Sequence, residues 1–190
     1  MLGIGGVRAL RALNESVDCY HFNEGHALFA GFELMREKMD DGADYPSALA
    51  STRAEVVFTT HTPIIQGNES HPIDRIVYMG ANLGFSKEQL VELGGEPFNM
   101  TVGALRLSKI SNAVAQLHGQ TANEMWRHVP DRSEILAITN AIHRPTWVDQ
   151  RLADAESDDS FWSLHMENKL LIGFSRRAAP YKRSDFIFSD

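Results

Sequence analysis

Short β-rich runs alternate along this chain with longer stretches that have helical periodicity. The runs with strand character span residues 17–22, 55–60, 135–138 and 169–174. Between them lie segments of ten or more residues, in several of which apolar side chains recur as on one face of a helix. Strands separated by helices of that length pair in parallel through β-α-β units. The pattern therefore predicts an α/β fold whose binding sites lie beyond the carboxyl ends of the strands, where His61 and Asn140 stand.

The ends of several helices can also be predicted. Asn23 is in position to cap a helix over residues 24–39, and Asp41-Gly42 would end that helix. A loop is expected from His61 to about Pro72, since proline cannot continue a strand ladder. The other expected helical segments are 7–13, 74–82, 86–93, 101–108 and 119–127, the last entered through residues 112–115.

Charge and composition narrow the possible functions. The 43% hydrophobic and 23% charged residues are typical of a globular chain. A net charge of -7 disfavours general affinity for nucleic acid or anionic membranes, because both reward a basic surface. Cys19 is the single cysteine, so no internal disulfide can form, and we expect a cytoplasmic protein. Neither a signal peptide nor an 18-residue uncharged apolar run is recognisable, so no membrane span is expected.

Four cations gather near the end of this acidic chain. Arg176, Arg177, Lys182 and Arg183 surround a turn between the strand at 169–174 and the start of a helix. Guanidinium groups bind phosphate through two parallel hydrogen bonds, and a helix amino terminus adds a favourable dipole. The spacing alone fits either a phosphate site or a solvated basic helix start.

Six segments occur in an order that is specific to one family. They are LGIGGVRALRAL at 2–13, HFNEGH at 21–26, TTHTP at 59–63, FNMT through LHG at 98–119, TNAIHRPTW at 139–147 and GFSRRAAPYKR at 173–183. Together they resemble the α-glucan (glycogen, starch or maltodextrin) phosphorylases of the bacterial and archaeal type. The resemblance spans nearly the whole chain.

The resemblance implies a two-domain enzyme of the GT-B type, with doubly wound, Rossmann-like α/β domains. Residues 1–140 would form the later part of the amino-terminal, glucan-binding domain, and residues 141–190 the hinge and the truncated start of the carboxyl-terminal one. The implied reaction is phosphorolysis of α-1,4-glucan or maltodextrin by inorganic phosphate, which releases α-glucose 1-phosphate. We expect an internal piece of such an enzyme, catalytically incomplete by itself.

The resemblance also implies roles for single residues on the glucan side. His61 matches the histidine that contacts the glucose at the cleavage point, and Asn140 an asparagine that holds the same sugar. His26 matches a histidine near the glucan entrance, or else caps or packs against its own helix. Glu24 either contacts sugar or interacts with its helix amino terminus. His118 falls inside a matching motif without an assigned role.

On the phosphate side, the implied cofactor is pyridoxal phosphate. Arg177 and Lys182 match the pair that holds the attacking phosphate, and Arg176 and Lys182 would help the cofactor side. None of the five lysines lies in the family's cofactor-anchoring motif, which belongs further downstream.

Three departures from the family pattern concern the site. The loop at 63–69 (PIIQGNE) differs from the usual sequence, so it is expected to contact glucan differently. Gly103 replaces a large apolar residue, at an expected cost in helix propensity and packing. Ala141 replaces a glycine, and would be strained if that position required a positive φ.

Other readings of the sequence remain as alternatives. A nucleotide-sugar glucan synthase shares the fold, but the TTHTP and RxxxYKR motifs argue against it. A non-catalytic glucan-binding module or a decayed pseudoenzyme also fits the departures. His21 and His26 lack a third ligand at suitable spacing, so we expect no metal site.

Overall fold

The computed structural model of the chain describes residues 2–148 and Asp154. The chain divides into two compact units, residues 1–140 and 141–190. In the second unit the described part contains α8 (Arg144–Trp147). The expected strand at 169–174 and the four cations that follow it lie outside the described residues.

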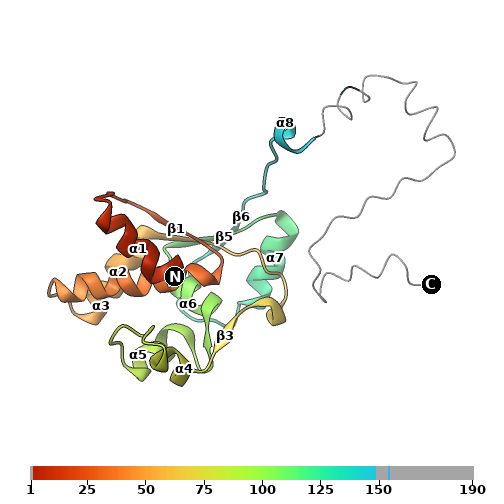
Figure 1. The fold of residues 1–190 in the computed structure, drawn as a ribbon. Helices are drawn as coiled ribbons and strands as arrows, with labels where there is room; N and C mark the ends of the chain where they lie inside the picture. The colour runs from red at the N-terminus through yellow and green to blue at the C-terminus, as the bar shows by residue number, and fades with distance from the viewer. Residues whose placement is uncertain (1, 149–153, 155–190) are drawn as a thin grey trace. The chain divides into compact units, whose positions relative to one another are not determined.

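The first unit is built on a parallel sheet of four strands. These are β1 (Tyr20–Asn23), β2 (Val56–Thr59), β5 (Ile110–Ala113) and β6 (Ile135–Ala137), and they lie side by side in that order (Figure 1). The predicted parallel α/β architecture is confirmed. Strand order follows chain order throughout, so the reversal that defines a doubly wound sheet is not seen among the described strands.

Helices precede and connect the strands of the first unit. They are α1 (Leu2–Ala12), α2 (Phe29–Asp40), α3 (Tyr45–Glu55), α4 (Ile73–Tyr78), α5 (Lys87–Gly94), α6 (Met100–Arg106) and α7 (Gln116–Met125). Helices overlap the segments expected at 7–13, 74–82, 86–93, 101–108 and 119–127. Gly42, with φ 102°, follows the end of α2 as expected.

The structure corrects the sequence prediction at three points. The helix expected over 24–39 is a short 3-10 helix, η1 (Gly25–Ala27), followed by α2; its cap is Glu24, because Asn23 is still part of β1. Residues 112 and 113, expected to lead into a helix, belong instead to β5. The expected loop up to Pro72 contains a 3-10 turn, η2 (Ile65–Gly67), and a short strand, β3 (Ser70–His71), that pairs antiparallel with β4 (Phe98–Asn99).

The core joins the sheet to α2 and α6 through large apolar side chains. Phe32 of α2 is buried, and its ring centroid lies 5.4 Å from that of Phe85 and 5.9 Å from that of Phe98, both edge-to-face. Phe58 of β2 is completely buried. Full burial of one such side chain stabilises a fold by about 1.5–3 kcal/mol, so this cluster fixes α2 and the strand that leads to the TTHTP loop.

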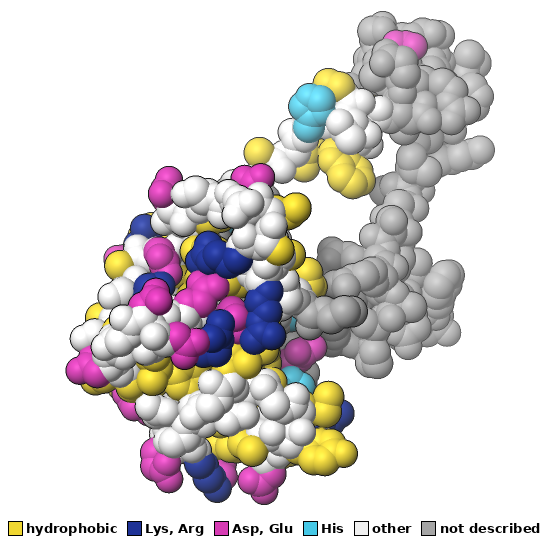
Figure 2. All heavy atoms as spheres, turned by 60° about the vertical axis from the view of Figure 1, so that its left-hand side comes forward, with side chains coloured by type: hydrophobic (Ala, Val, Ile, Leu, Met, Phe, Trp, Pro, Cys, Tyr) yellow, Lys and Arg dark blue, Asp and Glu magenta, His cyan; other side chains and the backbone are white. Residues whose placement is uncertain are grey.

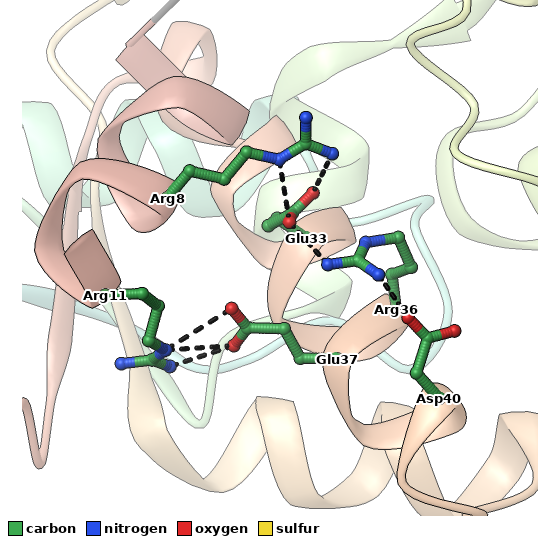
Figure 3. A network of polar contacts seen from close by, with 6 residues as sticks. All are labelled: Arg8, Arg11, Glu33, Arg36, Glu37 and Asp40. Atoms are coloured by element: carbon green, nitrogen blue, oxygen red, sulfur yellow. Dashed lines mark hydrogen bonds and ion pairs between the residues drawn. The ribbon is translucent and has the colours of Figure 1, made fainter.

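The α1–α2 contact depends on a glycine and on ion pairs. A Cβ on Gly3 would lie 2.7 Å from the backbone nitrogen of Ala30, so the helices approach too closely there for any side chain. Further along, Arg8 and Arg11 of α1 reach the carboxylates of Glu33 and Glu37 on α2 (Figure 3). On the face over these helices, basic and acidic side chains are interspersed (Figure 2).

Two expected costs are not seen. A Cβ on Gly103 would lie 2.6 Å from Leu28 Cδ2, so the space that a larger side chain would need is already filled by Leu28. Gly103 therefore fits its surroundings, and the expected loss of packing is wrong. Ala141 is not among the residues with positive φ, so its backbone does not require glycine.

Candidate functional site at the carboxyl edge of the sheet

The carboxyl ends of the four strands meet along one edge. Backbone hydrogen bonds continue the ladder past the strand ends, from Glu24 N to Thr59 O at 2.9 Å, from Thr60 N to Asn112 O at 3.0 Å and from Asn140 N to Val114 O at 3.0 Å. The residues that follow each strand are thereby held in register. The predicted site residues His61 and Asn140 both stand at this edge, and the side chains of both are exposed.

Glu24 links the end of β1 to the segment that follows β2. Its Oε1 accepts hydrogen bonds from the amide of His61 at 2.5 Å and from Thr62 Oγ1 at 3.0 Å. Its Oε2 accepts from the amide of Gly25 at 3.3 Å, which caps η1. The expected contact with its own helix amino terminus is confirmed, but the sequence did not indicate the grip on residues 61 and 62.

A row of hydrogen-bonded polar side chains crosses three strands at the same edge. Thr59 Oγ1 donates to Asn112 Oδ1 at 2.7 Å and lies 2.6 Å from His21 Nε2. Because the single hydroxyl hydrogen is used toward Asn112, His21 must donate from Nε2. This row of hydrogen bonds joins β1, β2 and β5 near the strand end that leads to His61.

His118 lies near His61 and Glu24. Its Nδ1 accepts from the amide of Val114 at 3.3 Å. Burial lowers the pKa of His118, the neighbouring His61 lowers it further, and Glu24 partly opposes them. The ring is therefore neutral at pH 7, with its hydrogen on Nε2. That Nε2 is shielded from solvent and has no hydrogen-bond partner among the described residues, which is uncommon for a buried donor.

His26 lines a small polar pocket next to this cluster. The pocket has a volume of about 140 Å³, and Glu24 and Thr62 form the wall that it shares with the strand edge. Its other lining residues are Gly25, Gly67, Asn68, Glu69, Met100 and Thr101. Three residues of the atypical loop at 63–69 thus border the pocket.

The described residues bring together only the glucan-side predictions. His26, His61 and Asn140 lie at the strand edge or in the adjoining pocket, whereas Arg176, Arg177 and Lys182 lie outside the described residues. No sequence signal marked His118, because β5, the strand before it, has the sequence Ile-Ser-Asn-Ala and lacks a run of β-branched or aromatic residues. Glu24 could have been suspected from its place after a strand, but its partners lie 37 and 38 residues away.

The described residues do not fit a pyridoxal phosphate site. Lys38 and Lys87 pair with Glu55 and Glu96, and Lys109 precedes β5 at its amino end, opposite the candidate site. No described lysine lines the pocket beside His26. In the part of the chain that the structure describes, no group of three or more His, Cys, Asp or Glu side chains is arranged to hold a metal ion. No described helix has both the length and the apolar character to cross a bilayer.

Comparison with known proteins identifies the family. No protein-family model matches the chain. Maltodextrin phosphorylase of Thermococcus litoralis is 32% identical, over 100% of this chain and 31% of its own length. Glycogen phosphorylase of Mycobacterium tuberculosis is 38% identical over 77% of the chain, and that of Aquifex aeolicus 26% over 100%. The chain belongs to the glycogen and maltodextrin phosphorylase family.

This phosphorylase-family chain covers only part of its relatives, and it also lacks residues inside the region that it matches. It spans 31%, 20% and 38% of the lengths of these three proteins, so it corresponds to a third or less of two of them. The alignment with the Thermococcus litoralis protein also runs over 254 positions, 64 more than the 190 residues of the chain. The relative therefore carries additional residues inside the matched region.

Proposed function

We propose that this chain binds the non-reducing end of an α-1,4-glucan at the carboxyl edge of its sheet, and that it does so for phosphorolysis to α-glucose 1-phosphate. The observation that carries the proposal is the position of His61 and Asn140 at the same edge of the sheet, in a chain related throughout its length to maltodextrin phosphorylase. Both side chains are exposed, and Thr62, the residue after His61, lines a pocket with several polar groups.

The chemistry of this edge suits a neutral sugar. A glucosyl unit offers hydroxyl groups that both donate and accept, and the edge supplies imidazole, amide and hydroxyl groups of both kinds. A pocket that pairs these groups gains specificity, because each buried polar group left unpaired costs about 1–3 kcal/mol. Neutral recognition also agrees with the acidic net charge, which gives no general attraction for anionic polymers.

On the phosphate side we assign Arg177 and Lys182 to the attacking phosphate, with Arg176 beside them. An arginine fork and a lysine point charge together hold a dianion that neutral groups could not. Pyridoxal phosphate is the cofactor implied by the family. Since the described residues offer no lysine to anchor it, no step of the reaction is assigned to it.

Titration of the 190-residue chain with maltopentaose tests the glucan site. We expect saturable binding by calorimetry and a Kd raised about tenfold or more in His61→Ala, the loss of roughly one hydrogen bond to the sugar. His128→Ala removes an exposed imidazole that follows α7 and should leave the Kd unchanged. Equal affinity of the His61→Ala variant and the parent would count against the site.

A second candidate function is glucan binding without catalysis, which the 64 additional positions of the relative favour. A chimaera separates phosphorolysis from binding without catalysis. In it, this chain replaces the aligned stretch of the Thermococcus litoralis enzyme. The measured quantity is the release of glucose 1-phosphate from maltopentaose and phosphate. Release that falls on His61→Ala substitution supports phosphorolysis. Retained maltopentaose binding without release supports a binding module.

A further inference from the structure

The backbone of Glu24 has a conformation that normally belongs to glycine. Its φ is 70° and its ψ 167°, a region essentially closed to residues with a Cβ. The next residue leaves the turn no room to relax, because a Cβ on Gly25 would lie 2.9 Å from Met100 Cβ. The turn from β1 into η1 is thus wedged against the start of α6. Glycine would fit position 24 without strain, so a glutamate there must contribute through its side chain.

One oxygen of that carboxylate binds the segment after β2, and the other binds the turn that follows β1. Oε1 accepts both from the His61 amide and from Thr62 Oγ1, and Oε2 accepts from the Gly25 amide. The amide of Glu24 is itself fixed to Thr59 O at 2.9 Å. The backbone of Glu24 is therefore held by the sheet, and its carboxylate reaches the backbone of His61, the residue that we assign to glucose binding.

We propose that Glu24 is a positioning residue that fixes the backbone of His61 for glucan binding. His61 and Thr62 have left the strand, and Pro63 interrupts backbone donation directly after them. The bonds to Glu24 replace the ladder that ends at Thr60. The strained backbone of Glu24 and its two bonds to residues 61 and 62 act together. Conformational stability is lost at residue 24, and the orientation of residue 61 is fixed. The inference rests on the proposed function in so far as His61 binds glucan.

The test uses Glu24→Gly in the 190-residue chain, because glycine keeps the turn and removes the grip. We expect a Tm within about 5 °C of the parent, as strain relief offsets the lost bonds. Hydrogen exchange of the His61 amide, followed by NMR, should accelerate about tenfold or more. The Kd for maltopentaose should rise about tenfold or more. Glu24→Gln keeps one oxygen acceptor, so its His61 exchange rate and its Kd for maltopentaose should lie between those of the parent and of Glu24→Gly.

Asn14→Gly is the matched backbone control. Asn14 also has a positive φ, 55°, but lies beyond the end of α1, and its replacement should change neither His61 exchange nor maltopentaose affinity. Unchanged His61 exchange and unchanged affinity in Glu24→Gly overturn the proposal. If that variant does not fold, the same two measurements on Glu24→Gln decide it. If the parent itself fails to bind maltopentaose, the proposed function fails, and the exchange measurement alone decides whether Glu24 anchors His61.

Discussion

At the scale of single residues, Glu33 links the stability of the fold to pH. Its side chain is 1% exposed and accepts hydrogen bonds from Arg8 at 2.9 and 3.0 Å and from Arg36 at 2.7 Å. Burial alone raises the pKa of this carboxyl, but the hydrogen bonds from the two guanidinium groups outweigh burial and hold the pKa below its ordinary value. A pKa that is lower in the folded than in the unfolded chain stabilises the fold above the unfolded pKa. That stability is lost as the pH falls through the folded pKa.

We predict that Glu33→Gln removes this contribution. The amide does not ionise, so the variant should have a lower free energy of unfolding than the parent at pH 7, and the difference should shrink below about pH 4. Urea unfolding at a series of pH values measures both. Glu124→Gln, in an exposed pair with Arg127, should shift the free energy by less than about 1 kcal/mol throughout. Parallel pH profiles for Glu33→Gln and the parent would contradict the prediction.

At the scale of elements, α1 contains glycines with opposite roles. A Cβ on Gly3 would meet the backbone of α2 at 2.7 Å, whereas a Cβ on Gly5 would meet nothing within 4 Å. Gly3→Ala must therefore push the helices apart, and we predict that it lowers the free energy of unfolding by about 1–3 kcal/mol. Gly5→Ala should raise it by about 0.5–1 kcal/mol, because alanine is the better helix former. Denaturant unfolding of both variants measures this, and effects of the same sign would show that the contact is misjudged.

At the scale of the whole molecule, the proposed phosphate site predicts anion binding that is independent of glucan. Arg177→Ala should weaken binding of inorganic phosphate to the chain about 10- to 100-fold, since a charge-assisted hydrogen bond contributes roughly 1.5–3 kcal/mol. Arg177→Lys should restore it only in part, because an ammonium keeps the charge but not the fork. Calorimetric titration with phosphate measures these constants.

The control for the phosphate prediction is a cation elsewhere on the surface. Arg127→Ala, at an exposed position beside Glu124, should leave phosphate binding unchanged. Affinity for maltopentaose should also stay unchanged in Arg177→Ala. A variant that lost maltopentaose and kept phosphate would show that Arg177 acts on the glucan side instead.

The sequence by itself determined the family, the parallel α/β class and most helices, because these depend on local periodicity and on motifs a few residues long. The strand at Val56–Thr59 is β-branched and aromatic in every position, so its tendency is local. β5, with the sequence Ile-Ser-Asn-Ala, has no such tendency and is a strand because β2 and β6 pair with it on both sides. Only the tertiary structure decided that Glu24 grips His61 and that His118 lies beside them. These residues are far apart in the chain, and no periodicity encodes a hydrogen bond across 37 residues.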